Sequence, residues 1–494
     1  MLELLSTGFL TVLQPTTILL MLLGSVWGIV FAAVPGLSTG MAVVLALPLT
    51  YGMGSIDGLA TLSGIYVGGM SGGLIGSTLL GIPGTSSAVA TTFDGFPLAR
   101  SGYPGKAMGI GIWSSFVGGV FGAVVLLLSA PTVARWASRL GPWEYTSLVV
   151  LGLTMIASLS GTSIAKGFIS GVLGVLVGTV GSDPIFGASR LTFGFRALRG
   201  GLHFIPVMIG LFAISQLMSD LEKGTEGQAY NADRLRIPNR ESLAAVFGNL
   251  KALWIAMLSG VAIGALPGVG ASISSIWSYD QVKRFSKNRA EFGKGSPEGI
   301  IAAEASNSAT AGGTLIPMLA LGLPGNPISV IMMGAVMIHG ITPGPLFISR
   351  HSDIAYGLFA AFLVVNVLVL LAQLLFTRLY VKVLAVPVRI LAPIVIVFCV
   401  IGSFAHNNRM ADVFVMLGSG IAGYGLTKLA IPLAPAILGL ILGPTLEENI
   451  RLALMSSSSL VPFVTRPVSL VFLLLSLASI VLVLFERLRA GKSE

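Results

Sequence analysis

The sequence has few charged residues and almost no cysteine. Asp, Glu, Lys and Arg make up 10% of the 494 residues, whereas soluble domains have roughly 25%. Such a chain cannot cover a water-facing surface with charge, so a water-soluble protein is excluded. The single cysteine, Cys399, cannot form an internal disulfide. Because 54% of the residues are hydrophobic, the composition indicates a multi-pass membrane protein.

Groups that carry out catalysis are also scarce. Four histidines and one cysteine provide neither a nucleophile with its base nor a metal cluster. The glycine-rich stretch from Gly68 to Gly76 lacks the lysine of a phosphate-binding loop. We therefore expect no enzyme, no metal centre and no organic cofactor. An integral membrane enzyme remains the alternative from another class.

Long apolar runs predict membrane-spanning helices, and one hydrophilic stretch separates them into two groups. Runs of roughly 20 apolar residues are long enough to cross a bilayer. The stretch 220–251 carries charges of both signs and predicts a hydrophilic loop between a first repeat, 1–219, and a second repeat with C-terminal spans, 252–494. The predicted spans are 16–34, 107–130, 145–165, 167–180, 204–218, 354–376, 383–404, 410–425 and 468–485.

Four Pro-Gly pairs interrupt other apolar segments. They are Pro35-Gly36, Pro83-Gly84, Pro267-Gly268 and Pro324-Gly325. Proline removes a backbone donor and glycine admits positive φ, so each pair predicts the end of one half-helix and the start of another. Such backbone is tolerated at membrane depth only inside protein or beside a wet cavity.

The pairs also reveal an internal repeat. Gly72 and Gly313 each lie 11 residues before the proline of the second pair in their half. Basic residues occur at 283–294 but not in the equivalent loop near Asp57, and at 100–106 but not at 340–346. Because the charge bias reverses, the positive-inside rule predicts halves of opposite orientation. The expected fold is an all-α polytopic membrane protein with two inverted-topology repeats that contain Pro-Gly broken helices, which is typical of secondary transporters.

Charge also predicts how the ends of the chain are placed. No Lys or Arg occurs in the first 99 residues, whereas Arg487, Arg489 and Lys492 lie near the C-terminus. By the same rule, the N-terminus is expected outside and the C-terminus inside.

The breaks supply groups that suit an anion. Helix N-termini offer free N–H groups and the positive end of the dipole, and nearby hydroxyl groups add donors. The alternative is that these side chains only cap helices. The candidate substrate-binding residues at the breaks are Ser38, Thr39, Gly84, Thr85, Ser86, Ser87, Ser272, Gly325 and Asn326.

Acidic side chains in apolar segments are candidates for coupling an ion gradient. Glu304 lies within the apolar run 300–311, and such residues are costly unless they function. Asp94 is a second candidate, which alternatively caps a turn. Sodium would use backbone oxygens at Pro35, Gly36, Pro267 and Gly268, whereas a proton would use Glu304. The sequence leaves both ions open.

The ordered motifs resemble one known family over nearly the whole chain. They include Pro35-Gly36-Leu37-Ser38, Gly81-Ile82-Pro83-Gly84-Thr85, Asp94-Gly95-Phe96-Pro97, Glu304-Ala305-Ser306-Asn307, Leu321-Gly322-Leu323-Pro324-Gly325 and Pro343-Gly344-Pro345. With these motifs the chain resembles the large membrane (permease) subunit of the tripartite tricarboxylate transporter family. Where that family usually has two adjacent asparagines, this chain has Asn307 followed by Ser308. The resemblance adds Asn307 to the candidate substrate-binding residues.

The resemblance implies a bacterial inner-membrane permease that imports di- or tricarboxylates or related organic anions by symport. In such a membrane the predicted orientation places the N-terminus in the periplasm and the C-terminus in the cytoplasm. A sodium or proton gradient would drive it. Its partners would be a small membrane subunit of about four spans and a soluble periplasmic solute-binding protein. A closer rival is an autonomous ion-coupled exporter or antiporter of organic anions, which needs no binding protein. Neither nucleic acid nor a nucleotide is expected as a ligand.

Overall fold

A computed structural model of the chain describes residues 2–34, 36–159, 163–183, 187–223, 235–457 and 459–490. Two compact units are formed from discontinuous segments, Met1–Ala134 with Gln216–Phe398, and Arg135–Ser215 with Cys399–Glu494. The predicted repeats, 1–219 and 252–494, follow the internal sequence similarity, whereas these units follow contacts, so the repeat boundaries stay a prediction.

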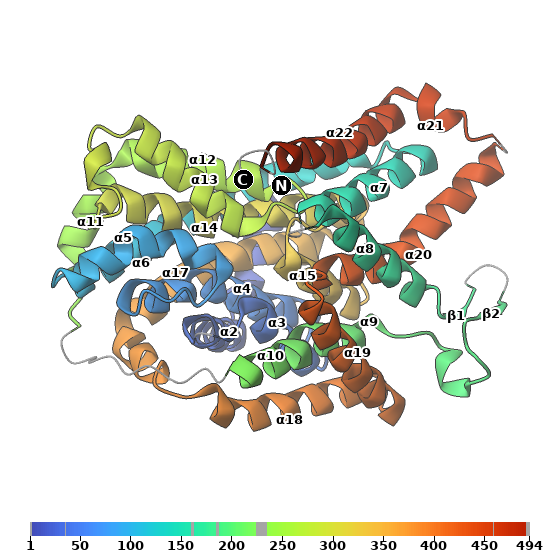
Figure 1. Cartoon of the computed structure of the whole chain (residues 1–494), viewed down its shortest axis with the longest axis horizontal. Helices are drawn as coiled ribbons and strands as arrows, with labels where there is room; N and C mark the ends of the chain where they lie inside the picture. Colours follow the sequence, from blue (N-terminus) through green and yellow to red (C-terminus); the bar gives the residue numbers. More distant parts are fainter. Residues whose placement is uncertain are drawn as a thin grey trace. The chain divides into compact units, whose positions relative to one another are not determined.

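The first unit consists of helices (Figure 1). They are α1 (Leu2–Val12), α2 (Pro15–Ala33), α3 (Thr39–Thr50), α4 (Ser55–Leu79), η1 (Ser86–Ala88), α5 (Val89–Arg100), most of α6 (Pro104–Ala137), α10 (Ser215–Lys223), α11 (Asn239–Gly248), α12 (Leu250–Gly264), α13 (Gly270–Phe285), η5 (Arg289–Glu291), α14 (Pro297–Leu321), α15 (Pro327–Ile338), α16 (Phe347–Arg350), α17 (Ser352–Val383) and the first half of α18 (Val388–Asn407).

The second unit contains the remaining helices and one short hairpin. Its elements are α7 (Pro142–Leu159), α8 (Ile164–Gly178), β1 (Gly181–Ser182), β2 (Ser189–Arg190), η2 (Arg196–Leu198), α9 (Phe204–Ile209), the π-helical segment η3 (Gly210–Ile214), α19 (Met410–Lys428), α20 (Leu433–Ser456), α21 (Pro462–Thr465) and α22 (Pro467–Ala490). β1 and β2 pair antiparallel. The all-α prediction is confirmed apart from this hairpin.

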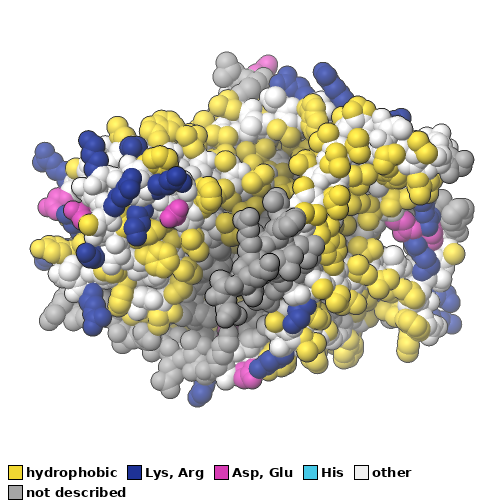
Figure 2. All heavy atoms as spheres, turned by 45° about the horizontal axis from the view of Figure 1, so that its top comes forward, with side chains coloured by type: hydrophobic (Ala, Val, Ile, Leu, Met, Phe, Trp, Pro, Cys, Tyr) yellow, Lys and Arg dark blue, Asp and Glu magenta, His cyan; other side chains and the backbone are white. Residues whose placement is uncertain are grey.

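Several helices are long and apolar enough to cross a membrane. Within the described residues there are six, or seven if the bent pair α11 and α12 forms one span. The predicted spans 16–34, 107–130, 204–218, 354–376 and 410–425 fall on helices of this set. In Figure 2 many of the described side chains at the surface are hydrophobic, and Lys and Arg gather at the left end, where α11, α12 and α13 lie in Figure 1. The chain is a polytopic membrane protein.

Three details of the predicted organisation are wrong. The boundary between the predicted spans 145–165 and 167–180 is placed too late, because α8 already begins at Ile164. The stretch 220–251 is not all loop, since α11 occupies Asn239–Gly248 and buries Ser242 and Val246. Helix α4 is also a span, which the sequence analysis missed because its many glycine and serine residues lower its hydropathy.

Two equivalent helices form the centre of the first unit. Every residue of α4 from Gly58 to Leu79 is buried, and so is every residue of α14 from Gly299 to Ala320. Helix α4 contacts α2, α3, α14 and α17, while α14 contacts α12, α13 and α5. A helix with apolar or small residues on every face belongs in the interior of a protein. Both helices therefore form the core of the unit, and the breaks pack against them.

The packing of α2 on α4 repeats in the packing of α12 on α14. Gly28 and Gly260 each lie seven residues before the first proline of their half, and Ile65 and Ser306 each lie 18 before the second. A Cβ atom on Gly28 would lie 2.2 Å from the Ile65 carbonyl oxygen, and one on Gly260 would lie 2.6 Å from that of Ser306. Equivalent glycines therefore meet equivalent carbonyl groups, which supports the internal repeat.

The glycines predicted to be equivalent behave in the same way. A Cβ atom on Gly72 would lie 2.7 Å from the Ile29 carbonyl oxygen, and one on Gly313 would lie 2.7 Å from that of Val261. Only a residue without a side chain allows helices to approach this closely. The two glycines that lie at equivalent positions in the sequence repeat therefore also make equivalent contacts between helices.

Candidate functional site

All the predicted breaks separate helices. Helix α2 ends before Gly36, α4 before Gly81, α12 before Gly268 and α14 before Gly322, and these four glycines have positive φ. The left-handed conformation favours glycine because a Cβ atom would be strained there. Pro35, a predicted coupling-ion residue, lies outside the described residues.

The second break of each half rests on the end of the helix before the first break. A Cβ atom on Gly84 would lie 1.9 Å from the Ala32 carbonyl oxygen, and one on Gly325 would lie 2.7 Å from that of Gly264. Both carbonyl groups come from the last turn of a helix, α2 or α12. Gly84 and Gly325 are thus packed against backbone, so their place in the site is fixed by helix packing.

Asn326 begins helix α15. Its Oδ1 accepts a hydrogen bond of 2.7 Å from the Ser329 amide, and the Ser329 hydroxyl accepts one of 2.8 Å from the Asn326 amide. This reciprocal pair satisfies two donors at the helix start. The Asn326 Nδ2 donates to the Tyr66 hydroxyl at 3.2 Å, which is also hydrogen-bonded to Thr314 at 2.8 Å. Asn326 therefore caps its helix and also connects to α4 and α14.

The first break contributes Ser38 and Thr39 at the start of α3. The Ser38 hydroxyl oxygen accepts a 3.1 Å hydrogen bond from the Met41 amide, so it caps the helix. Thr39 is buried, and its hydroxyl has no hydrogen-bond partner among the described residues. A Cβ atom on Gly69 would lie 2.7 Å from this hydroxyl, which therefore faces α4.

Ser86 and Ser272 bring the two halves together. The Ser272 hydroxyl donates to that of Ser86 at 2.9 Å. Ser86 follows the second break of the first half, and Ser272 lies in the first turn of α13 after the first break of the second half. Ser86 is exposed and Ser272 half-buried. Beside them, the Thr85 and Ser87 hydroxyls are 3.1 Å apart. These four hydroxyl groups form the hydroxyl cluster.

Glu304 is fully buried, and within the described part of the chain its carboxylate accepts hydrogen bonds from two hydroxyl groups alone. Thr91 of α5 donates to its Oε1 at 2.5 Å, and Ser115 of α6 donates to its Oε2 at 2.7 Å. No salt bridge to Glu304 occurs within the described residues. A buried carboxylate without a positive partner is costly unless it takes up a proton or a cation. The site is therefore suited to either.

Asp94 is surrounded by donors. Its Oδ1 accepts from the amides of Gly293, Gly295 and Ser296 at 2.8 to 2.9 Å, and its Oδ2 accepts from the Tyr279 hydroxyl at 2.7 Å. These contacts join α5 to α13 and to the loop before α14. Its carboxylate thus holds the loop that leads into the helix of Glu304.

The remaining predicted residues lie at contacts between helices. The Asn307 Nδ2 donates to the Met70 carbonyl oxygen of α4 at 2.7 Å, and its buried Oδ1 has no partner among the described residues. The Gly268 amide, which follows Pro267, donates to the Gly325 carbonyl oxygen at 2.9 Å. The two breaks of the second half are therefore bonded to each other.

Gly36 lies beside an acidic residue that the sequence analysis assigned to the hydrophilic loop. A Cβ atom on Gly36 would lie 3.4 Å from the carboxyl carbon of Asp220. Asp220 is buried on α10 and accepts hydrogen bonds from Gln216 at 3.0 and 3.1 Å. A carboxylate therefore lies next to backbone that was predicted to bind sodium. Among the described residues, no group of three or more His, Cys, Asp or Glu side chains is placed to hold a metal ion.

Sequence reasoning missed several residues that complete these sites. Thr91, Ser115 and Tyr279 are ordinary in sequence, and only the fold brings them to Glu304 and Asp94. Tyr66 had a usable signal, because it lies 17 residues before Pro83, as Asn307 lies 17 before Pro324. Aligning the two halves on these prolines would have singled it out.

Comparison with known proteins gives one family and two relatives. The sequence model described as "Tripartite tricarboxylate transporter TctA family" matches residues 18–438. An uncharacterized 52.8 kDa protein in the TAR-I ttuC' 3' region of Agrobacterium vitis is 33% identical over 492 residues, which cover 99% of this chain and 97% of the relative. An uncharacterized protein in the TAR-II ttuC' 3' region of the same organism is 38% identical over 236 residues, covering 48% of this chain and 98% of the relative. No solved structure matches the chain.

Proposed function

Because the chain belongs to the tripartite tricarboxylate transporter TctA family, we propose that it is the membrane permease subunit of a binding-protein-dependent secondary transporter. It imports di- or tricarboxylates or related organic anions by symport, driven by a sodium or proton gradient. A transporter family and a helical membrane fold support this assignment over an integral membrane enzyme.

The contact between Ser86 and Ser272 is the observation that carries the proposal. It joins breaks from opposite halves, and each hydroxyl lies near the start of a helix, η1 followed by α5 in one half and α13 in the other. Helix starts attract anions through free amides and the positive end of the dipole. Neither break contains Lys or Arg, so a carboxylate can bind and leave without separating from a fixed charge.

Substrate binding involves the hydroxyl cluster together with the buried polar groups behind it. Thr39, Asn307 and Asn326 face α4 from three other helices. Gly84 and Gly325 fix the backbone of the hairpins, and Ser38 fixes the start of α3. In this proposal the caps orient the helix starts, and Ser86 and Ser272 contact the anion.

The coupling ion binds separately from the substrate. Two coupling ions are alternatives: a proton would use the buried carboxyl group of Glu304, whereas sodium would use backbone oxygens at Gly36, Pro267 and Gly268, and at Pro35, which lies outside the described residues. The hydrogen bond between Gly268 and Gly325 connects this backbone to a substrate hairpin. Asp94 contributes by holding the loop before α14.

The partners follow from the family. We propose a small membrane subunit and a periplasmic solute-binding protein that delivers the anion, in a bacterial inner membrane with the N-terminus in the periplasm. Exposed large hydrophobic side chains, such as Leu258 and Leu375 in the first unit and Phe414 and Leu474 in the second, support contact with lipid or with a membrane subunit.

Uptake in proteoliposomes tests the proposal. Vesicles that contain both membrane subunits receive an imposed sodium or proton gradient and a radiolabelled tricarboxylate such as citrate, or a radiolabelled dicarboxylate, without ATP. Uptake should require the gradient and the periplasmic protein. Equal uptake without the periplasmic protein would identify an autonomous carrier, and accumulation only with ATP would contradict a secondary transporter. Ser349→Ala, an exposed hydroxyl on α16, is the matched control for Ser86→Ala and Ser272→Ala.

A further inference from the structure

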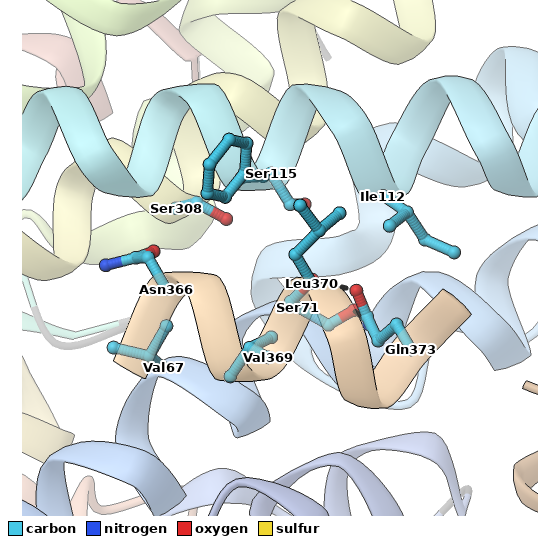
Figure 3. A pocket seen from close by; sticks show the side chains of 10 residues that line it. Val67, Ser71, Ile112, Ser115, Ser308, Asn366, Val369, Leu370 and Gln373 are labelled. Atoms are coloured by element: carbon cyan, nitrogen blue, oxygen red, sulfur yellow. Dashed lines mark hydrogen bonds between the residues drawn. The ribbon is translucent and has the colours of Figure 1, made fainter. Parts of the chain in front are cut away.

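A small polar cavity lies one hydrogen bond away from Glu304. It has a volume of about 10 Å³ and is lined by residues of α4, α6, α14 and α17 (Figure 3). This is room for about one water molecule. Ser115, which donates to Glu304 at 2.7 Å, is part of its wall, as are Ser71, Ser308, Asn366 and Gln373.

Two groups in the wall have unused hydrogen-bonding capacity. Ser308 is 4% exposed, and its hydroxyl makes no hydrogen bond with any described residue. Figure 3 shows it among the residues lining the cavity. Asn366 donates through Nδ2 to the Phe362 carbonyl oxygen at 2.7 Å, which leaves its Oδ1 without a donor within the described part of the chain. By contrast, Ser71 and Gln373 bond to each other at 3.0 and 3.2 Å.

A water molecule fits these unused groups. It can accept from Ser308 and donate to Asn366 Oδ1 and to Ser115 Oγ, whose own proton points to Glu304. That arrangement gives the water three partners, the usual number for a buried water. It also forms a continuous line of hydrogen bonds from the cavity, through Ser115, to the carboxyl group.

We propose that this cavity holds one ordered water molecule and that the water and Ser115 pass protons to and from Glu304. The inference deepens the proposed function, because it names the proton as the ion carried by this carboxyl group. A protonated water gives one proton to Ser115 Oγ while Ser115 gives its hydroxyl proton to Glu304 Oε2. Water, an intact serine and a neutral carboxyl group result, and release follows the same steps in reverse.

Other titratable groups around Glu304 are engaged elsewhere. On α5 and α13, Asp94 and Tyr279 bond to each other. Tyr66 on α4 bonds to Thr314 and Asn326. The remaining charged residues of the helices packed on α14 are exposed or half-buried, and so is Glu298 of α14 itself; they are Asp57, Arg100, Lys106, Arg135, Arg240, Glu241, Lys251, Asp280, Lys283, Arg284 and Arg350. The protonation of Glu304 is therefore exchanged through its hydroxyl partners.

Infrared difference spectroscopy on the purified full chain in lipid nanodiscs tests this without any substrate. After a rapid change of pH, the carboxyl signal that is present in the wild type and missing in Glu304→Gln reports protonation of Glu304. Ser308→Asn fills the cavity, and we expect the signal to reach the same end point about tenfold more slowly. Ser349→Asn makes the same change at an exposed site and should follow the wild type.

Three results would overturn the inference. The first is a Glu304 signal that does not change with pH. The second is a protonation rate in Ser308→Asn equal to that of the wild type. The third is loss of the signal when sodium chloride replaces choline chloride at fixed pH, which would indicate a cation in the cavity. If Ser308→Asn is not monodisperse, Ser308→Ala decides, because it keeps the space and removes one partner of the water. A wild-type rate in that variant contradicts the relay. Because no organic anion is added, failure of the proposed substrate leaves this measurement intact.

Discussion

The Gly268 amide donates a hydrogen bond of 2.9 Å to the Gly325 carbonyl oxygen. This bond connects the first break of the second half to the second. The backbone proposed to bind sodium and the hairpin proposed to approach the substrate are thus adjacent. No side chain intervenes at this contact, because both partners are backbone groups.

Glycines at equivalent positions of the repeat should be equally intolerant of a side chain. In Gly28→Ala and Gly260→Ala, the new Cβ atom would lie 2.2 or 2.6 Å from a carbonyl oxygen of the central helix. Overpacking of this kind costs about 1 to 3 kcal/mol of unfolding free energy. Both variants should lower the melting temperature of the purified protein in detergent.

Gly418→Ala is the matched control for this prediction. Gly418 lies in helix α19, and nothing lies within 4 Å of the position its Cβ atom would take. We expect a melting temperature equal to or slightly above that of the wild type, since alanine favours helix over glycine. Equal stability of Gly28→Ala and Gly418→Ala would contradict the packing described above.

Asp94→Ala should destabilise the protein before it affects any transport step. The substitution removes the acceptor of three backbone amides and of the Tyr279 hydroxyl. Leaving such donors buried costs about 1 to 3 kcal/mol each at most positions, so the abundance of folded protein in the membrane should fall strongly. Fluorescence-detected gel filtration measures this.

Asp280→Ala controls for the loss of an acidic side chain. Asp280 is exposed on α13, and its removal should leave abundance unchanged. If Asp94→Ala instead accumulates normally and loses only uptake, Asp94 acts in coupling, as the sequence analysis first suggested.

The positions of the breaks could be predicted from the sequence because proline and glycine act locally. Their repetition at matched spacing also identified Gly72 and Gly313, which occupy equivalent contacts. The partners of Glu304 could not be predicted in this way. Thr91 and Ser115 are 213 and 189 residues away in sequence, and threonine or serine in a membrane helix more often bonds to its own backbone.

Some outcomes depended on competing local signals. Hydropathy favoured a span that continues to residue 165, yet α8 already begins at Ile164. Asn326 and Ser38 were candidates for binding substrate, and the structure shows that both cap helices. The same residue types, such as serine and asparagine, occur at the start of a helix whether they cap it or bind an anion. Sequence alone therefore does not separate the two roles.

Glu304→Gln should abolish coupled uptake while preserving the fold. Glutamine keeps the size of the side chain and one oxygen that can accept from Thr91 or Ser115, but it cannot gain or lose a proton. Membrane abundance and melting temperature should remain close to those of the wild type, whereas gradient-driven uptake in proteoliposomes falls to background. Full uptake by this variant would show that the carboxyl group is dispensable.

The predicted orientation can be tested with single cysteines. Cys399 is buried, so Cys399→Ala gives a background for Glu3→Cys and Lys492→Cys. An impermeant thiol reagent added to intact cells should label the position near the N-terminus and not the one near the C-terminus. Labelling after lysis confirms that both cysteines are reactive, and the reverse pattern in intact cells would invert the topology.

The hydroxyl groups of Ser86 and Ser272 should bind the substrate jointly. They are 2.9 Å apart and come from opposite halves of the repeat, so one carboxylate can contact both. Loss of one neutral hydrogen bond costs about 0.5 to 1.5 kcal/mol, or roughly a factor of 2 to 13 in affinity. Ser86→Ala and Ser272→Ala should each weaken citrate or dicarboxylate binding within this range, measured by isothermal titration calorimetry.

The double variant should lose less binding free energy than the sum of the two single losses, because removing either hydroxyl already disrupts the shared contact. Strict additivity would indicate separate contacts, and unchanged affinity in both single variants would place the substrate elsewhere.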